Sequence, residues 1–185
     1  MVSTKQDYLI VIDMQNDFIS GSLGSSDAQA ILPKVKDKIQ HFQGPVIFTM
    51  DTHNQDYLHT VEGQALPIEH CLKDTWGWQL EAGLESVKND MTSLSPELVK
   101  VFEKPVFASL ELAQYLKKQW EQGFVNSITL VGLCTDVCVI SNALLLKAFL
   151  PELPIHVDSS CCAGVTKEKH EAALETMRSC QIHVE

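Results

Sequence analysis

Apolar residues along this chain fall into short, nearly continuous runs, and these runs alternate with stretches of helical spacing. The continuous runs predict buried strands at residues 8–13, 45–51, 99–103, 127–132, 155–158 and 181–184. Apolar positions that recur every three or four residues predict helices at 28–42, 109–122, 135–149 and 167–179. No period holds from Thr52 to Gly77, which is typical of a long functional loop.

The alternation of strands and helices predicts the fold class. This order builds βαβ units with parallel strands, and continuously apolar strands are expected where helices cover both faces of a sheet. A length of 185 residues suits one domain. We therefore predict an α/β protein. It would be a single doubly wound domain over residues 1–185, with a six-stranded parallel sheet flanked by helices on both faces.

Charge and composition narrow the range of partners. The chain has 24 acidic and 14 basic residues, which disfavours nucleic acid because phosphate binding needs clustered Lys and Arg. No apolar run is long enough to span a bilayer, and the N-terminal residues do not form a signal peptide. The sequence predicts a cytoplasmic protein with no nucleic-acid or membrane partner, whose six cysteines are free thiols.

Three side chains suited to covalent catalysis follow separate predicted strands. Asp13 ends the first strand, Lys104 follows the third, and Cys138 lies in the first turn of the helix after the fourth. The carboxyl ends of parallel strands meet at one edge of the sheet, where ligands bind. A helix N-terminus lowers the pKa of a thiol, a carboxylate can carry its proton, and a cation supports both charges. The set predicts a cysteine nucleophile with an acid and a lysine as partners.

A second group of polar residues predicts a metal site. Asp51 ends the second strand and His53 lies two residues on, so both side chains lie on one side of this extended segment. His59, Glu62 and His70 follow in the irregular loop. Imidazole and carboxylate ligands together suit Zn²⁺, Mn²⁺ or Fe²⁺.

Five segments in a fixed order carry a family resemblance. The most specific, at 131–139, reads Val-Gly-Leu-Cys-Thr-Asp-Val-Cys-Val. The others are Val-Ile-Asp-Met-Gln-Asn-Asp-Phe at 11–18, Asp-Thr-His at 51–53, Leu-Pro-Ile-Glu-His-Cys at 66–71 and Phe-Glu-Lys-Pro at 102–105. Together they resemble the motifs of the isochorismatase-like cysteine hydrolase superfamily, and within it of the nicotinamidases (pyrazinamidases). The resemblance covers nearly the whole chain.

The resemblance implies an amidase mechanism. Cys138 would attack the carboxamide of nicotinamide, ammonia would leave, and water would hydrolyse the thioester. The backbone N–H groups of Cys134 and Cys138 would form an oxyanion hole, next to a cis peptide bond between Leu133 and Cys134. Phe18 would line the pocket and pack on a flat substrate ring.

The resemblance also implies one divalent metal ion. Zinc is expected first, with manganese or iron as alternatives. Asp51, His53 and His70 match the ligand pattern best, and the further ligand is either Glu62 or His59. A homo-oligomer is compatible with the family, although no segment of the sequence marks its interface.

Other interpretations stand beside this one. Another amidase of the superfamily would act on an N-carbamoyl or ureido compound, and many of those enzymes use no metal. Isochorismate hydrolysis is disfavoured because its enzymes lack the nucleophilic cysteine. A thiol redox protein, using Cys134 with Cys138 or Cys161 with Cys162, would leave the lysine and the first aspartate unexplained. A binding module without catalysis would not need all of these residue types.

Overall fold

The computed structural model describes residues 5–185 and is built on one six-stranded sheet in which all strands are parallel. The strand order is β3-β2-β1-β4-β5-β6. The strands are β1 (Gln6–Ile12), β2 (Val46–Asp51), β3 (Val99–Lys104), β4 (Val125–Leu133), β5 (Ile155–Ala163) and β6 (His183–Val184). The predicted parallel sheet is therefore confirmed.

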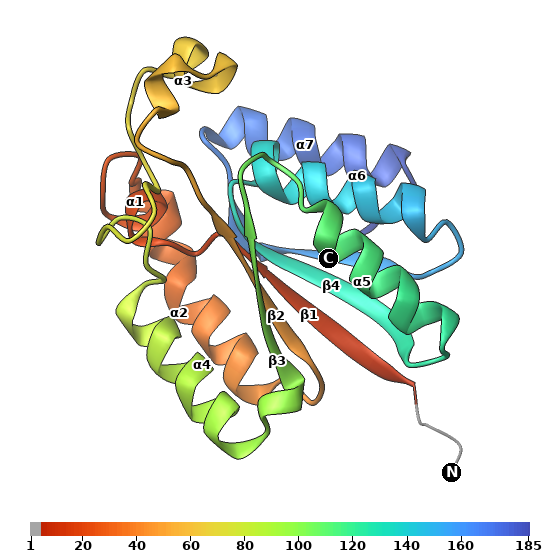
Figure 1. Ribbon diagram of the computed structural model, residues 1–185. Helices are drawn as coiled ribbons and strands as arrows, with labels where there is room; N and C mark the ends of the chain where they lie inside the picture. The colour runs from red at the N-terminus through yellow and green to blue at the C-terminus, as the bar shows by residue number, and fades with distance from the viewer. Residues whose placement is uncertain (1–4) are drawn as a thin grey trace.

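Helices cover both faces of this sheet (Figure 1). One face carries α2 (Ser26–His41) and α4 (Ala82–Leu94), and the other carries α5 (Leu110–Glu121), α6 (Ile140–Phe149) and α7 (Lys167–Ser179). The shorter elements are α1 (Asn16–Ile19), α3 (Val61–Ala65), 3₁₀ turns at Tyr57–His59 and Pro96–Leu98, and a π-helical turn at Thr135–Val139. Within the described residues 5–185, no helix is both long and apolar enough to cross a membrane.

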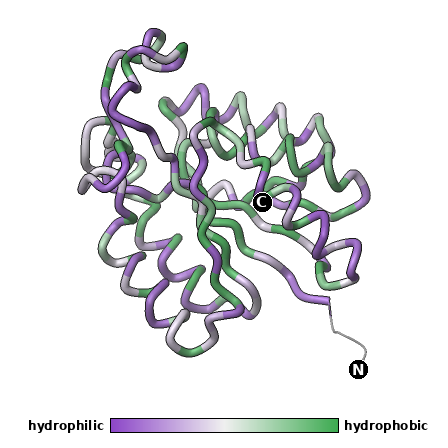
Figure 2. The backbone as a smooth tube through the Cα atoms, viewed as in Figure 1, coloured by the Kyte–Doolittle hydropathy of each residue, from purple (hydrophilic) through white to green (hydrophobic). Residues whose placement is uncertain are grey.

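Side-chain alternation along β1 explains why a core forms on each face. Leu9 and Val11 pack on the side of α2, together with Val35. Ile10 and Ile12 point the other way and pack with residues of α5, α6 and α7. All five side chains are fully buried, and burying each contributes about 1.5–3 kcal/mol. Figure 2 shows the resulting pattern, with hydrophobic residues along the central strands and hydrophilic residues toward the outside.

The structure corrects several predicted elements. Helix α4 was not predicted, because only Leu84 and Val87 of it are buried and the apolar period is weak. β5 runs on to Ala163 instead of ending at residue 158. The helix expected over 135–149 begins as the π-helical turn and becomes regular only at Ile140. The loop after Thr52 contains the 3₁₀ turn at 57–59 and α3.

The strand order reverses beside β1. The chain adds β2 and β3 on one side of β1 and then returns to add β4 on the other. Ligands of doubly wound sheets bind outside the carboxyl ends of the strands at such a reversal. Asp13 directly follows β1, Lys104 ends β3, and the turn that carries Cys138 follows β4. All three predicted catalytic residues therefore lie at this edge.

Candidate active site

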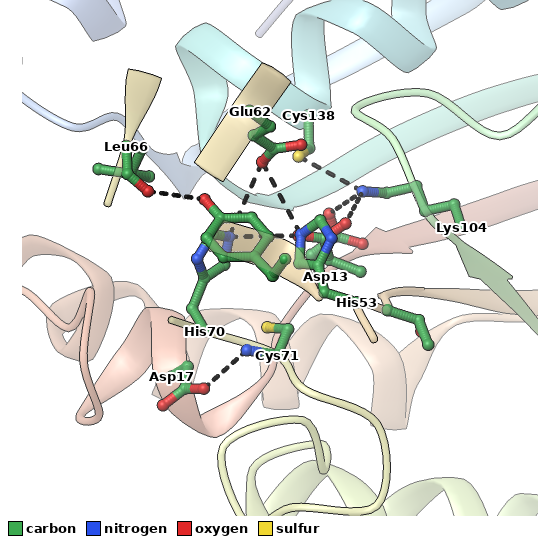
Figure 3. Close-up of polar contacts among 12 residues, drawn as sticks. Asp13, Asp17, His53, Glu62, Leu66, His70, Cys71, Lys104 and Cys138 are labelled. Carbon is green, nitrogen blue, oxygen red and sulfur yellow. Dashed lines mark hydrogen bonds and ion pairs between the residues drawn. The ribbon is translucent and has the colours of Figure 1, made fainter. Parts of the chain in front are cut away.

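The structure brings the three predicted catalytic side chains into direct contact (Figure 3). Lys104 Nζ lies 2.6 Å from Asp13 Oδ2 and 3.4 Å from Cys138 Sγ. The same ammonium lies 3.3 Å from Asp51 Oδ1, so it also touches the second group of polar residues. All four side chains are buried. Burial disfavours the charged lysine, but Asp13, Cys138 and Asp51 together outweigh this and the pKa of Lys104 is raised.

Asp13 is held by its backbone and by Thr49. Its φ of 47° lies in the left-handed region, which a non-glycine residue keeps only when the surrounding structure fixes it. The Thr49 hydroxyl donates to Asp13 Oδ1 at 2.6 Å and accepts from the Asp13 N–H at 3.2 Å. Burial raises the pKa of the Asp13 carboxyl, and Lys104 offsets only part of that rise. Asp13 is therefore a stronger base than an exposed aspartate.

The end of β4 approaches β1 closely just before the π-helical turn at Thr135–Val139, the cysteine turn, which carries Cys138. Gly132 has a φ of 118°, and a Cβ atom there would lie 2.1 Å from the carbonyl oxygen of Ile12, so only glycine fits. The peptide bond between Leu133 and Cys134 is cis, which confirms the expectation from the sequence.

Hydrogen bonds to two backbone carbonyl groups fix the conformation of the cysteine turn. The Cys134 carbonyl accepts from the N–H groups of Val137 and Val139, each at 3.1 Å. The Cys138 carbonyl accepts from Asn142 Nδ2 at 2.8 Å. The Asn142 side chain is buried and also contacts the loop after Lys104, where it accepts from the Ser109 N–H and donates to the Phe107 carbonyl. This asparagine, which was not predicted from the sequence, joins the loop after Lys104 to the cysteine turn.

One expectation about Cys138 is wrong. A helix N-terminus was expected to lower the pKa of its thiol, but burial raises this pKa well above its ordinary value, and the nearby Asp13 carboxylate raises it further. Burial likewise raises the pKa of Cys134 to about 12. Burial therefore favours the neutral thiol of Cys138, and a nucleophilic role would require a base beside it.

The second group brings four potential metal ligands together. One ligand atom from each of Asp51, His53, Glu62 and His70 lies within 4.8 Å of all the others. His53 Nε2 lies 3.0 Å from Asp51 Oδ2 and 3.8 Å from Glu62 Oε1. His70 Nε2 lies 3.7 Å and 3.9 Å from the same two oxygens. Ligands at about 2.0–2.2 Å from one zinc ion are separated by about 3–3.5 Å, so small shifts would suffice to fit one ion.

The structure distinguishes between the two candidates for the further ligand. Glu62 lies on α3 with its carboxylate turned toward the imidazoles, as Figure 3 shows. His59 lies three residues earlier and is exposed, outside the group of ligand atoms. The geometry therefore favours Glu62 over His59 as the fourth potential metal ligand.

Hydrogen bonds orient the ligand atoms. His70 Nδ1 lies 2.8 Å from the Ile68 carbonyl, so this nitrogen carries the proton and Nε2 keeps its lone pair for the cluster. Burial would raise the pKa of Asp51, but its contacts with His53 and His70 outweigh this and the pKa is held low. The donor set is thus two imidazole nitrogens and two carboxylate oxygens, which suits a divalent transition metal.

Two residues that support this cluster escaped the sequence analysis. Gln15 is buried and holds Asp51 on both sides. Its Oε1 accepts from the Asp51 N–H at 2.7 Å, and its Nε2 donates to the Asp51 carbonyl at 2.8 Å. The Tyr57 ring packs against the rings of His53 and His70 at centroid distances of 4.6 and 4.9 Å. Gln15 stands in the largely polar stretch from Asp13 to Asp17, so no local pattern in the sequence marks it.

Phe18 lies beside the cluster as well. Its ring is buried and its centroid is 5.6 Å from that of His70. All six cysteines are free thiols, so the structure contains neither of the cysteine pairs considered for a redox protein as a disulfide.

Comparisons with known proteins agree with this fold. The sequence profile of the isochorismatase domain matches residues 7–185. The nicotinamidase of Saccharomyces cerevisiae is 24% identical over 177 residues, which cover 74% of this chain and 79% of the yeast protein. The nicotinamidase/pyrazinamidase of Bacillus subtilis has a TM-score of 0.81 at 26% identity, covering 97% of this chain and 98% of that one. The pyrazinamidase of Pyrococcus horikoshii in complex with zinc has a TM-score of 0.75 at 25% identity, covering 97% and 98%.

The family profile spans nearly the whole chain, from the second residue of β1 to the last residue, and this range includes every residue of the site described above. This protein therefore belongs to the isochorismatase domain family.

Proposed function

We propose that this protein is a cysteine amidohydrolase that converts nicotinamide and water to nicotinate and ammonia. The observation that carries the proposal is the buried contact of Lys104 with both Asp13 and Cys138, directly beside the histidine and carboxylate cluster. The likeness to proteins named as nicotinamidases supports the choice of substrate.

The first half of the reaction forms a thioester. Asp13 takes the proton of the Cys138 thiol, and the sulfur attacks the carboxamide carbon. The backbone N–H groups of Cys134 and Cys138 stabilise the oxygen anion of the tetrahedral intermediate. Asp13 then gives its proton to the departing nitrogen, so that ammonia leaves. Lys104 remains charged throughout and stabilises the negative charge on the thiolate and the carboxylate.

The second half of the reaction hydrolyses the thioester. Asp13 takes a proton from water as the water oxygen attacks the acyl carbon, and the same N–H groups stabilise the second tetrahedral intermediate. Collapse of that intermediate releases the acid and the sulfur, and the proton returns to Cys138. The raised pKa of Asp13 suits this exchange, because a proton carrier works best with a pKa near the working pH.

The cluster fits one divalent ion, which Asp51, His53, Glu62 and His70 would hold. Zinc is the first candidate, with manganese or iron as alternatives. Such an ion would bind a ring nitrogen or a water as a further ligand, if it takes more than these four. Phe18, packed against His70, would then flank an aromatic ring held there.

The setting of this activity also remains a proposal. The reaction would belong to NAD salvage in the cytoplasm, with a small-molecule amide as the substrate and no nucleic-acid or membrane partner. The net charge of −10 is consistent with the absence of a nucleic-acid partner. Association into a homo-oligomer is a further expectation from the family.

Ammonia release from several amides tests the substrate. The purified protein would be incubated with nicotinamide, with pyrazinamide and with an N-carbamoyl amino acid, each after loading with zinc and after treatment with a chelator. We expect zinc-dependent release from the two aromatic amides. Release from the N-carbamoyl compound alone would contradict the proposed substrate and favour another amidase of the superfamily.

A further inference from the structure

Asp17 binds the chain segment that carries a proposed metal ligand. It lies on α1, outside the group of ligand atoms, and its Oδ2 accepts from the Cys71 N–H at 2.8 Å (Figure 3). Its Oδ1 accepts from the Ser22 N–H at 3.2 Å. Its own N–H donates to the Gly77 carbonyl at 3.0 Å. Asp17 thus joins α1 to both ends of the segment from Cys71 to Gly77, through its carboxylate at Cys71 and its backbone N–H at Gly77.

Two glycines enclose this carboxylate. A Cβ atom at Gly77 would lie 2.0 Å from Asp17 Oδ2, and one at Gly21 would lie 2.4 Å from Asp17 Oδ1. Gly77 does not have a left-handed φ, so its φ does not require glycine. The Asp17 carboxylate is therefore what excludes a side chain at position 77, and the two residues fit each other.

The bond to Asp17 acts on the cluster through Cys71. Cys71 has a φ of 46°, in the left-handed region, and it directly follows His70. The Cys71 carbonyl accepts from the His53 N–H at 3.0 Å. Asp17 thus orients the peptide unit that joins His70 to Cys71, and the next carbonyl along the chain holds the backbone of His53. Both proposed imidazole ligands depend on this segment.

We propose that Asp17 is a positioning residue for the metal cluster. Its carboxylate, seated against Gly77, holds the His70–Cys71 peptide unit so that both imidazoles converge with Asp51. Loss of this contact weakens metal binding, although Asp17 itself touches neither the metal nor the substrate. The inference rests on the metal site of the proposed function and adds to it the residue that holds the site in shape.

Zinc affinity measured on variants of both partners tests this inference. The variants are Asp17→Ala, Asp17→Asn, Gly77→Ala and the double variant Asp17→Ala with Gly77→Ala. Zinc alone would be titrated into the chelator-treated protein against a competing chromophoric chelator, and the melting temperature of the metal-free protein would be recorded for each. Asp90→Ala, at an exposed carboxylate on α4, is the matched control.

A second control addresses the glycine. A Cβ atom at Gly83 would meet only the ends of the flexible Glu81 and Lys36 side chains, so Gly83→Ala should leave zinc affinity unchanged. Removal of a residue that orients a metal ligand typically lowers metal affinity about 10- to 100-fold. We expect that loss in Asp17→Ala and in Gly77→Ala, with metal-free melting temperatures close to those of the control variants.

The remaining variants separate positioning from general destabilisation. Asp17→Asn keeps an acceptor oxygen for the Cys71 N–H, so its affinity should stay within about tenfold of the parent. Gly77→Ala should cost less in the Asp17→Ala background, because the new methyl group then meets no carboxylate. Full additivity of the two losses would overturn the inference.

The outcomes also separate this inference from the proposed function. A parent protein that binds zinc, with Asp17→Ala and Gly77→Ala binding it equally well, would overturn the positioning role alone. A parent that binds no zinc would overturn the metal site and the positioning role together. Loss of zinc affinity that only follows a lower melting temperature of the metal-free variants would also overturn it.

Discussion

Replacing Lys104 with methionine removes the positive charge that, among residues 5–185, contacts both Asp13 and Asp51. The Lys104 ammonium lies 2.6 Å from Asp13 Oδ2 and 3.3 Å from Asp51 Oδ1, and all three side chains are almost fully buried. Methionine has a similar volume, so little packing is lost. The change instead leaves buried carboxylates without their counter-charge.

The expected loss of stability is large. At an effective dielectric constant of about 20, charges 2.6 Å apart attract with roughly 6 kcal/mol, but much of this is offset because the lysine no longer has to be desolvated. Removing one partner of a buried pair typically costs about 3–5 kcal/mol. We expect that loss for Lys104→Met in the metal-free protein at pH 7. Lys118→Met, at an exposed position on α5, should change stability by less than about 0.5 kcal/mol.

The loss should depend on pH with a definite sign. Burial raises the pKa of Asp13, and Lys104 opposes that rise, so the folded-state pKa increases further in the variant. A carboxyl with a raised folded-state pKa destabilises the fold when ionised, and this penalty disappears as pH falls through that pKa toward the unfolded value near 4. The deficit of Lys104→Met relative to the parent should therefore shrink between pH 7 and pH 4.

Urea unfolding followed by circular dichroism at several pH values measures this deficit. The double variant Asp13→Asn with Lys104→Met should recover part of the loss, because it removes both charges of the pair. A loss below about 1 kcal/mol at pH 7, or a deficit that stays constant with pH, would refute the view that Lys104 compensates buried carboxylates.

Three further changes test other parts of the site and fold. Glu62→Gln should weaken zinc binding at least about tenfold, whereas His59→Gln should leave it unchanged because His59 is exposed; equal effects in a zinc titration would contradict the ligand assignment. Phe18→Ala should raise the KM for nicotinamide about tenfold through lost ring packing, and an unchanged KM in steady-state assays would exclude Phe18 from the pocket. The hydrogen bond from Lys38 holds the pKa of Asp158 below its usual value despite partial burial. Lys38→Met should therefore lose about 1 kcal/mol at pH 7, and this difference should vanish in acid as pH falls through the lowered pKa; a difference of the same size in acid unfolding curves would contradict the pairing.

The sequence was sufficient to predict the sheet and the meeting of the three proposed catalytic residues at its edge. Strands that are buried on both faces leave continuous apolar runs, and the rule that ligands bind at the carboxyl ends of parallel strands then placed Asp13, Lys104 and Cys138 together. Helix α4 left a weaker signal, because only Leu84 and Val87 of it are buried.

Other features depended on contacts between residues far apart in the sequence. Gln15 holds Asp51 across 36 positions, which no local pattern encodes. The choice of Glu62 over His59 depended on the direction in which α3 turns its side chains. The pKa of Cys138 was predicted in the wrong direction, because a helix N-terminus can be read from sequence, whereas complete burial beside Asp13 cannot.

Ammonia release from nicotinamide by the parent protein, by Cys138→Ala and by Cys134→Ala tests the central claim most directly. Cys138→Ala removes the proposed nucleophile, whereas Cys134→Ala keeps the backbone N–H group that the mechanism uses. We predict robust release by the parent, measurable release by Cys134→Ala and none above background by Cys138→Ala. Release by Cys138→Ala at the rate of the parent would contradict the account.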